Sequence, residues 1–401
     1  MKDFKISFVI EEIPSYAISY NADRRKSFEM QAFDGKMDIS IVYDFNSSPL
    51  MQSSNISLGD KVELVLMPHR IELYINGVLT DEEWPAGKIL FNKDDNIISD
   101  LTIAVEEYTE KKKNEPIIIS SFENADGWHP GGGVFVGDCM PYRKDDEFHI
   151  LYLKDRRHHQ SKWRLGAHQW NHISTKDFKE WYVHPTAIEI TDPKEGSICT
   201  GSWIREGKKE YLFYTVRMYD WSPAPIMRSI SDDGYHFEKD EKFGFTLPDK
   251  YDTGRARDPK VIKDDNGLYH MFITTSLMEE KRGCLAHFVS DDLDNWRDMG
   301  KPVYIAEDET EPECPDYFFY CGKYYLVYSL HGKAYYMYSD KPFDEFKVPS
   351  DPSIPCTRVP KGAIWGEELV FVGYVPWEGR YAGTMEFKRA KAKDNGELVF
   401  E

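Results

Sequence analysis

Residues 231–237 read SDDGYHF, and residues 290–296 repeat the pattern as SDDLDNW. Two weaker copies are STKDFKEW from Ser174 and SDKPFDEF from Ser339, so successive serines are 57, 59 and 49 residues apart. An apolar strand precedes each copy, and an aromatic-rich strand precedes that one. A period of about 50 residues with several short strands in each unit is typical of a β-propeller. The repeat therefore predicts an all-β fold.

A fifth, partial unit follows residue 361, where IWGEELVFVGYV is followed by GTMEFKRA. We therefore expect a five-bladed β-propeller over residues 121–401. A two-sheet sandwich with accidental similarity between its strands is the alternative. The charged stretch EYTEKKKNEP, residues 107–116, ends in proline and has no apolar period. It predicts a linker over residues 111–120.

The first 110 residues have the alternation of half-buried strands. Val62, Leu64 and Leu66 alternate with polar residues, and a second alternating run ends at Asn76-Gly77, the strongest short signal for a hairpin. Residues 1–110 therefore predict a β-sandwich. The segment IELYINGVLTDEEW resembles the hairpin of lectin-like, laminin-G-type jelly rolls.

The composition excludes several classes of function. The chain has 401 residues with 50 Lys and Arg against 69 Asp and Glu, a net charge of −19, which disfavours binding to nucleic acid or to an anionic membrane. The start, MKDFKISFVIEEIP, is broken by charges and does not predict a secretory signal. The six cysteines form no C-x-x-C pair, so we expect reduced thiols in a cytoplasmic protein and no metal or organic cofactor.

Three carboxylates share one structural position in the repeat. Asp138, Asp258 and Glu313 each stand near the start of a blade, where the first strand lines the central channel. Carboxylates there are costly unless they are paired or used. Crowded like charges let one carboxyl stay protonated, as glycoside hydrolysis requires. A metal site, or salt bridges to Arg257 or Lys260, are the alternatives.

Two motifs resemble glycoside hydrolase family 32, the β-fructofuranosidase family of five-bladed propellers. They are Arg257-Asp258-Pro259 and Glu313-Cys314-Pro315-Asp316, each at the start of a blade. The resemblance implies cleavage of β-fructofuranosidic bonds with retention. It implies that Asp138 is the nucleophile, Asp258 the transition-state stabiliser and Glu313 the general acid/base. The expected substrate-binding residues are Trp163, Thr200, Arg257, Cys314 and Tyr374.

The chain also departs from the family pattern. The usual Asn-Asp-Pro-Asn-Gly around the nucleophile is here Gly137-Asp138-Cys139-Met140-Pro141, and a glutamine of the next strand is replaced near Lys154. The sandwich precedes the propeller rather than following it. Two alternatives therefore stay open: an inverting pentosidase of the family 43 type, and a sugar-binding propeller without turnover. In each case the expected partner is a small carbohydrate, and the basic stretch KDRRHH leaves a phosphorylated sugar possible.

Overall fold

The computed structural model of the chain describes the following residues: 3–11, 18–23, 26–33, 35–43, 46–67, 70–83, 97–99, 101–109, 117–120, 127–130, 134–156, 168–192, 194–218, 220–377 and 380–401. These residues form β-strands, and no α-helix occurs among them. Within the same stretches, no helix is long and apolar enough to cross a membrane. Backbone contacts divide the chain into two compact units, one of which is Met1–Lys112 with two short later segments.

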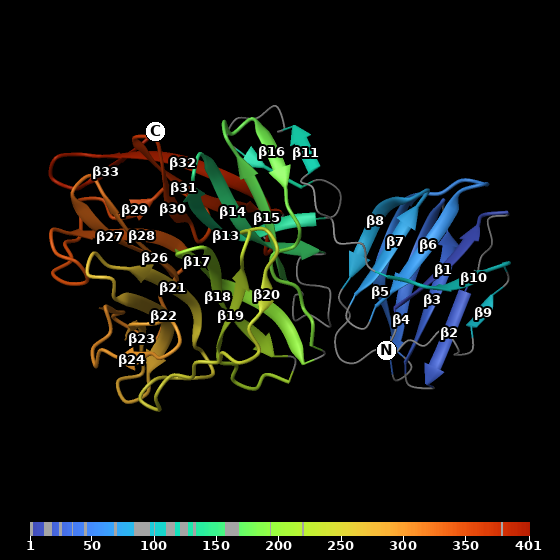
Figure 1. Ribbon diagram of the computed structural model, residues 1–401, viewed down its shortest axis with the longest axis horizontal. Helices are drawn as coiled ribbons and strands as arrows, with labels where there is room; N and C mark the ends of the chain where they lie inside the picture. Colours follow the sequence, from blue (N-terminus) through green and yellow to red (C-terminus); the bar gives the residue numbers. More distant parts are fainter. Residues whose placement is uncertain are drawn as a thin grey trace. The chain divides into compact units, whose positions relative to one another are not determined.

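The first unit contains two five-stranded antiparallel sheets, drawn in blue and teal in Figure 1. One hydrophobic cluster takes residues from both sheets, because the alternating apolar side chains of each sheet turn toward the same interior. One sheet has the order β10 (Ala104–Glu107), β1 (Phe4–Val9), β6 (Lys61–Leu66), β7 (Ile71–Ile75) and β8 (Val78–Glu83). The other has the order β5 (Asn46–Asn55), β4 (Lys36–Tyr43), β3 (Lys26–Phe33), β2 (Ile18–Asp23) and β9 (Ile97–Ser99).

The hairpin expected at Asn76-Gly77 is confirmed. These two residues join β7 to β8, and both have positive φ, 52° and 77°, as the tight hairpin turn requires. Val62, Leu64 and Leu66 of β6 are all fully buried. The period-2 alternation therefore identified the inward face of this sheet correctly.

The second unit consists of antiparallel sheets whose strands follow one another in chain order (Figure 1). One sheet is β17 (Glu195–Glu206), β18 (Lys209–Met218), β19 (Ile226–Ser231) and β20 (Glu238–Lys239). The next is β21 (Arg257–Lys263), β22 (Tyr269–Leu277), β23 (Arg282–Ser290) and β24 (Arg297–Asp298), with β25 (Tyr304–Ile305) also on β23. A further sheet is β26 (Glu313–Tyr320), β27 (Lys323–Leu330), β28 (Lys333–Ser339) and β29 (Ser353–Ile354).

The remaining sheet of this unit combines its first and last strands. Its order is β11 (Ile117–Ser120), β16 (Glu180–Val183), β15 (Gln169–Thr175), β14 (Glu147–Arg156), β13 (Val134–Lys144), β32 (Gly383–Ala392), β31 (Glu368–Pro376) and β30 (Lys361–Trp365). β12 (Gly127–Trp128) and β33 (Leu398–Phe400) also pair with β32. Among the described residues, the pair Val136–Gly383 joins β13 to β32 and so connects the two halves. The expected linker, residues 111–120, contains a strand at its end. There the apolar segment Ile117–Ser120 forms β11, which pairs with β16 at the edge of the sheet.

The serine repeat marks the end of the third strand of each sheet. The hydroxyl of Ser231 accepts a hydrogen bond from the backbone N–H of Gly234 (2.8 Å), and that of Ser290 accepts one from Leu293 (2.9 Å). In the first copy the hydroxyl that accepts is that of Thr175, from the backbone N–H of Phe178 (2.8 Å). Thr175 stands one residue after Ser174, where we expected this hydroxyl. The repeated motif is thus a hydroxyl-capped turn that ends a strand.

The first strands of the sheets pack side by side at the centre of this unit. β13 contacts β30, β30 contacts β26, and β26 contacts β21. Residues of β13, β17, β21, β26 and β30 line one common cavity. Outside this centre, hydrophobic clusters shared by neighbouring sheets form the core. The residues at the start of each first strand are therefore brought together.

Candidate active site

A β-bulge lies at each of the three predicted carboxylates. Asp138, Asp258 and Glu313 all stand near the start of a first strand, where the pairing with the second strand slips. Bulges re-aim side chains and are common beside active sites. The slips fall between Val136 and Cys139, between Arg257 and Lys260, and between Glu313 and Asp316.

The local sequence explains two of these bulges. Pro259 and Pro315 have no backbone N–H to donate to a neighbouring strand, so regular pairing is interrupted at both. The residues before them, Asp258 and Cys314, have positive φ of 56° and 50°. This conformation costs on the order of 1–3 kcal/mol for a residue with a side chain, and such strain is concentrated at functional sites.

Asp138 is held by two hydroxyl groups from distant parts of the chain. Thr200 Oγ1 donates to Asp138 Oδ2 (2.5 Å), and Tyr381 Oη donates to Asp138 Oδ1 (3.0 Å). Burial raises the pKa of Asp138, while these two hydrogen bonds favour the ionised form and oppose the rise. The carboxylate is therefore fixed in orientation and partly withdrawn from water.

Cys314 connects Asp138 to Asp258. The Cys314 backbone N–H donates to Asp258 Oδ2 (3.1 Å), and its Sγ lies 3.7 Å from the same oxygen and 3.5 Å from Asp138 Oδ2. Asp258 is only 4% exposed. Burial raises the pKa of the Cys314 thiol, and the two carboxylates raise it further. The thiol is a neutral spacer that keeps the two carboxylates close.

Glu313 is the solvent-accessible member of the three, with half of its side chain exposed. Arg257 Nη2 donates to Glu313 Oε1 (2.9 Å), and Arg257 Nε lies 3.7 Å from Asp258 Oδ2. Desolvation raises the pKa of Glu313, Arg257 opposes that rise, and Asp258 adds to it. A carboxyl with a raised pKa and access to solvent can stay protonated and exchange its proton.

A cavity of about 290 Å³ opens beside Glu313. Its wall includes Arg217, Trp221, Arg255 and Arg257. Arg255 pairs with Glu311, whose other carboxylate oxygen lies 3.4 Å from Arg257 Nη2. The space next to Glu313 is therefore polar, cationic in part and flanked by the exposed indole of Trp221.

The predicted binding residues divide into three groups. Thr200, Arg257 and Cys314 all contact one or more of the three carboxylates. Tyr374 is buried, with its ring 5.5 Å from that of Tyr381, and burial followed by the charge of Asp138 raises its pKa. Trp163 lies outside the described residues.

Sequence reasoning missed Tyr381 and the residues behind it. The Tyr381 ring stacks on His168 with centroids 4.9 Å apart, and His168 Nε2 shares a 3.0 Å hydrogen bond with Asp155 Oδ1. Burial lowers the pKa of His168 to about 3, so the imidazole is neutral. Tyr381 lies between the two parts of the fifth, partial unit and outside both quoted stretches, so no periodic signal marked it.

One group of histidines has the spacing of metal ligands. Ring nitrogens of His149, His172 and His184 lie within 4.8 Å of one another. However, His149 Nδ1 and His172 Nε2 already share a 2.9 Å hydrogen bond, and His270 Nδ1 and His287 Nε2 share the same bond at 2.9 Å in another sheet. The repetition indicates that a buried histidine pair is a structural part of the blade.

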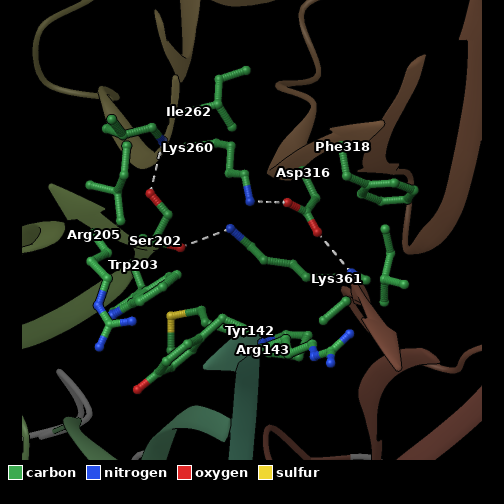
Figure 2. A pocket seen from close by; sticks show the side chains of 18 of the residues that line it. Tyr142, Arg143, Ser202, Trp203, Arg205, Lys260, Ile262, Asp316, Phe318 and Lys361 are labelled. Atoms are coloured by element: carbon green, nitrogen blue, oxygen red, sulfur yellow. Dashed lines mark hydrogen bonds and ion pairs between the residues drawn. The ribbon is translucent and has the colours of Figure 1, made fainter. Parts of the chain in front are cut away.

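A second cavity, of about 620 Å³, lies further along the same first strands (Figure 2). Lys260 Nζ is 2.5 Å from Asp316 Oδ1, and Asp316 Oδ2 accepts the backbone N–H of Gly362 (2.7 Å). Lys361 is 2% exposed and donates to the carbonyl oxygen of Gly201 (2.9 Å). Of the described residues that line this cavity, Asp316 alone is acidic.

The comparisons with known proteins agree with this architecture. Residues 139–348 match the family model described as glycosyl hydrolases family 32 N-terminal domain. The match covers more than half of the chain, so the chain belongs to glycoside hydrolase family 32, a family of glycosidases. The resemblance inferred from the Arg-Asp-Pro and Glu-Cys-Pro motifs is thereby confirmed.

Two curated relatives are sucrose-6-phosphate hydrolases. That of Vibrio alginolyticus is 27% identical over 186 residues, covering 45% of this chain and 36% of the relative. That of Escherichia coli is 24% identical over 197 residues, covering 47% of this chain and 39% of the relative. The chain thus spans less than two fifths of the length of these relatives.

Solved structures share the fold. Fructan 1-exohydrolase IIa from Cichorium intybus has a TM-score of 0.56 at 18% identity, covering 69% of this chain and 60% of that chain. Sucrose-6-phosphate hydrolase from Lactobacillus gasseri has a TM-score of 0.54 at 18% identity, covering 67% of this chain and 62% of that chain. At this identity the likeness concerns the all-β fold.

Proposed function

We propose that the protein hydrolyses β-fructofuranosidic bonds with retention of configuration. The observation that carries the proposal is the convergence of three bulged first strands, which link Asp138, Asp258 and Glu313 through Cys314 and Arg257. Relatives named for sucrose-6-phosphate and fructan hydrolysis support a fructoside substrate. A phosphorylated disaccharide belongs to the same set of candidates.

The roles follow from the environment of each carboxylate. Asp138, aligned by Thr200 and Tyr381, attacks the anomeric carbon of the fructosyl unit, and Glu313 gives its proton to the departing oxygen. Glu313 then takes a proton from water, which attacks the same carbon and releases Asp138. Buried Asp258, fixed by Cys314, accepts hydrogen bonds from sugar hydroxyls as positive charge develops on the ring.

The surrounding residues complete the site in this proposal. Arg257 tunes Glu313 and binds sugar hydroxyls, Trp163 supplies apolar surface for a sugar face, and the buried Tyr374 supports the Tyr381 ring from behind. The cavity beside Glu313 receives the leaving group, since the proton donor must stand next to the departing oxygen.

We also propose the fold type of each of the two units. The second unit is a five-bladed propeller whose first and last blades meet at the Val136–Gly383 pair. The first unit is a lectin-like β-sandwich. The protein needs no metal or organic cofactor in this mechanism, and we propose that it acts in the cytoplasm.

A panel of substrates tests the proposal. Sucrose, sucrose 6-phosphate, inulin-type and levan-type fructans and nitrophenyl pentosides are each incubated with the protein, and early products are followed by NMR. We expect release of fructose with the same anomeric configuration as the substrate. Turnover of pentosides with inversion would instead identify a family 43-type activity, and binding without turnover would identify a sugar-binding propeller.

A further inference from the structure

Tyr381 lies two residues before the start of β32 and forms two contacts with Asp138. Its hydroxyl donates to Asp138 Oδ1 (3.0 Å) and lies 3.4 Å from the backbone nitrogen of Asp138, which donates to it. The hydroxyl therefore closes a ring of hydrogen bonds between the side chain and the main chain of one residue. Such a ring restricts rotation of the carboxylate, because a turn about its bonds would break one contact or the other.

Gly137 leaves the space that the phenol occupies. A Cβ atom at this position would lie 2.5 Å from Tyr381 Oη, 2.9 Å from Cζ and 3.0 Å from Cε1. These distances are shorter than van der Waals contact, so any side chain at position 137 would displace the ring. Gly137 is also where the chain departs from the family's motif around the nucleophile.

The opposite face of the phenol is supported as well. His168 stacks on the Tyr381 ring with an interplanar angle of 29°, and the 3.0 Å hydrogen bond to Asp155 holds the imidazole. Asp155 is fully buried and His168 is 5% exposed. The ring thus lies between a glycine on one side and a braced imidazole on the other, and neither can easily move.

We propose that Tyr381 is a positioning residue that aligns Asp138 and favours its ionised form, and that the missing side chain of Gly137 leaves the space for the Tyr381 ring. This inference rests on the proposed role of Asp138 as nucleophile. A donor that favours the carboxylate serves both steps: it keeps Asp138 ionised for attack, and it stabilises the same carboxylate when water displaces it from the fructosyl carbon.

The test is a double-mutant cycle of Tyr381→Phe and Gly137→Ala. Tyr381→Phe removes the donor, so the acidic limb of the kcat/KM profile should move to higher pH by about one unit, with roughly ten-fold lower kcat/KM near the acidic limb. Gly137→Ala keeps the hydroxyl but displaces it, and should move the limb in the same direction. Because both changes remove one contact, the double variant should resemble the single variants rather than show the sum.

Two control variants separate this role from ordinary packing. Tyr325→Phe removes a buried hydroxyl that donates to the Gly396 carbonyl (3.0 Å), and Gly244→Ala adds a methyl group that meets Pro225 at an ordinary 3.6 Å. Both can change the melting temperature but should leave the pH profile in place. A shift of the acidic limb in the controls, or its absence in Tyr381→Phe, would overturn the proposal.

A readout without catalysis keeps this inference separable from the proposed function. The Asp138 carboxyl carbon is titrated by ¹³C NMR, with its signal assigned through Asp138→Asn, and its pKa should rise in Tyr381→Phe. An inactive wild type with this rise would reject the proposed function and keep the contact; activity without the rise would do the reverse. If Tyr381→Phe does not fold, 3-fluorotyrosine at position 381, a stronger donor, must move the titration to lower pH.

Discussion

The first strands of the second unit carry opposite electrostatic arrangements along their length. At their bulged starts, Asp138, Asp258 and Glu313 face one another, and desolvation raises the pKa of Asp138 and of Glu313. Further along, where pairing is regular again, the buried Asp316 pairs with the partly buried Lys260 beside Lys361 (Figure 2). One region concentrates carboxylates and strained backbone, while the other places a single carboxylate among lysines.

The difference indicates that the carboxylate region, Asp138, Asp258 and Glu313, serves chemistry, and that the lysine region, Lys260, Asp316 and Lys361, serves stability. Crowded carboxylates destabilise a fold, so their presence indicates a use. The pair of Lys260 with Asp316, which also accepts the Gly362 N–H, links neighbouring strands, and removing one partner leaves the other charge uncompensated. Changes in the carboxylate region should therefore alter activity with little loss of stability, and changes in the lysine region should do the opposite.

The largest expected effect comes from Asp138→Asn. Without a nucleophile, turnover should fall on the order of 10⁴–10⁶-fold on every substrate. The melting temperature should stay equal or rise, because the amide carries no buried charge. Steady-state rates with sucrose and with an activated fructoside, beside a melting curve, check both statements; a folded variant that retains normal turnover places the nucleophile elsewhere.

The next effect is that of Glu313→Gln, and it depends on the leaving group. General acid assistance is worth about 10²–10⁴-fold, so a sugar alkoxide should suffer that loss, while nitrophenolate should depart nearly as before. Azide should accelerate the second step, since it needs no base. Rates on the two substrate types with and without azide test this; equal losses on both, unmoved by azide, would reassign the proton donor.

In the lysine region the expected effect is on stability. Asp316→Ala leaves the buried Lys361 and the partly buried Lys260 without the negative charge between them, which should cost about 3–5 kcal/mol of unfolding free energy, with kcat of the folded fraction unchanged. Lys263→Met is the matched control: its pair with Glu206 (2.6 Å) is about two fifths exposed and should cost about 0–1 kcal/mol. Denaturant titrations measure both, and similar losses in the two variants would refute the contrast.

The smallest expected effect is a shift of the basic limb of the pH profile. Arg257 lowers the pKa of Glu313, so Arg257→Gln should raise that pKa and keep Glu313 protonated to higher pH. The basic limb of kcat/KM should then move to higher pH, although the rate itself falls. Lys263→Met should leave the limb in place, and a shift to lower pH in Arg257→Gln would contradict the assignment.

Much of this site was predictable because the chain marks it with local chemistry. The motifs Arg257-Asp258-Pro259 and Glu313-Cys314-Pro315-Asp316 identified two of the carboxylates at the start of a strand, although we predicted no bulge there. The hairpin at Asn76-Gly77 was equally local. In the linker, the apolar Ile117–Ser120 pairs with a strand that comes about 60 residues later, and no local rule reveals such a partner.

The unpredicted residues depend on contacts between distant parts of the chain. Tyr381 is 243 residues from Asp138, and its contact exists because Gly137 has no side chain. Asp316 belonged to a quoted motif and Lys361 to none, and the pairing of Asp316 with Lys260 was not predicted, since alternation indicates which face a residue occupies and not its partner. Both contacts arise where strands from different repeat units meet around one centre. The repeat predicts that these strands meet, but it does not predict which side chains contact one another.

The central claim is that Asp138 forms a covalent bond to the sugar at the carboxylate end of these strands. The most direct measurement is mass spectrometry of Glu313→Gln after incubation with an activated β-fructoside, followed by peptide mapping. We expect one fructosyl adduct per chain, on the peptide that contains Asp138, and its loss when azide is added. Turnover of the substrate with no adduct, or an adduct on a peptide that lacks Asp138, would contradict the account.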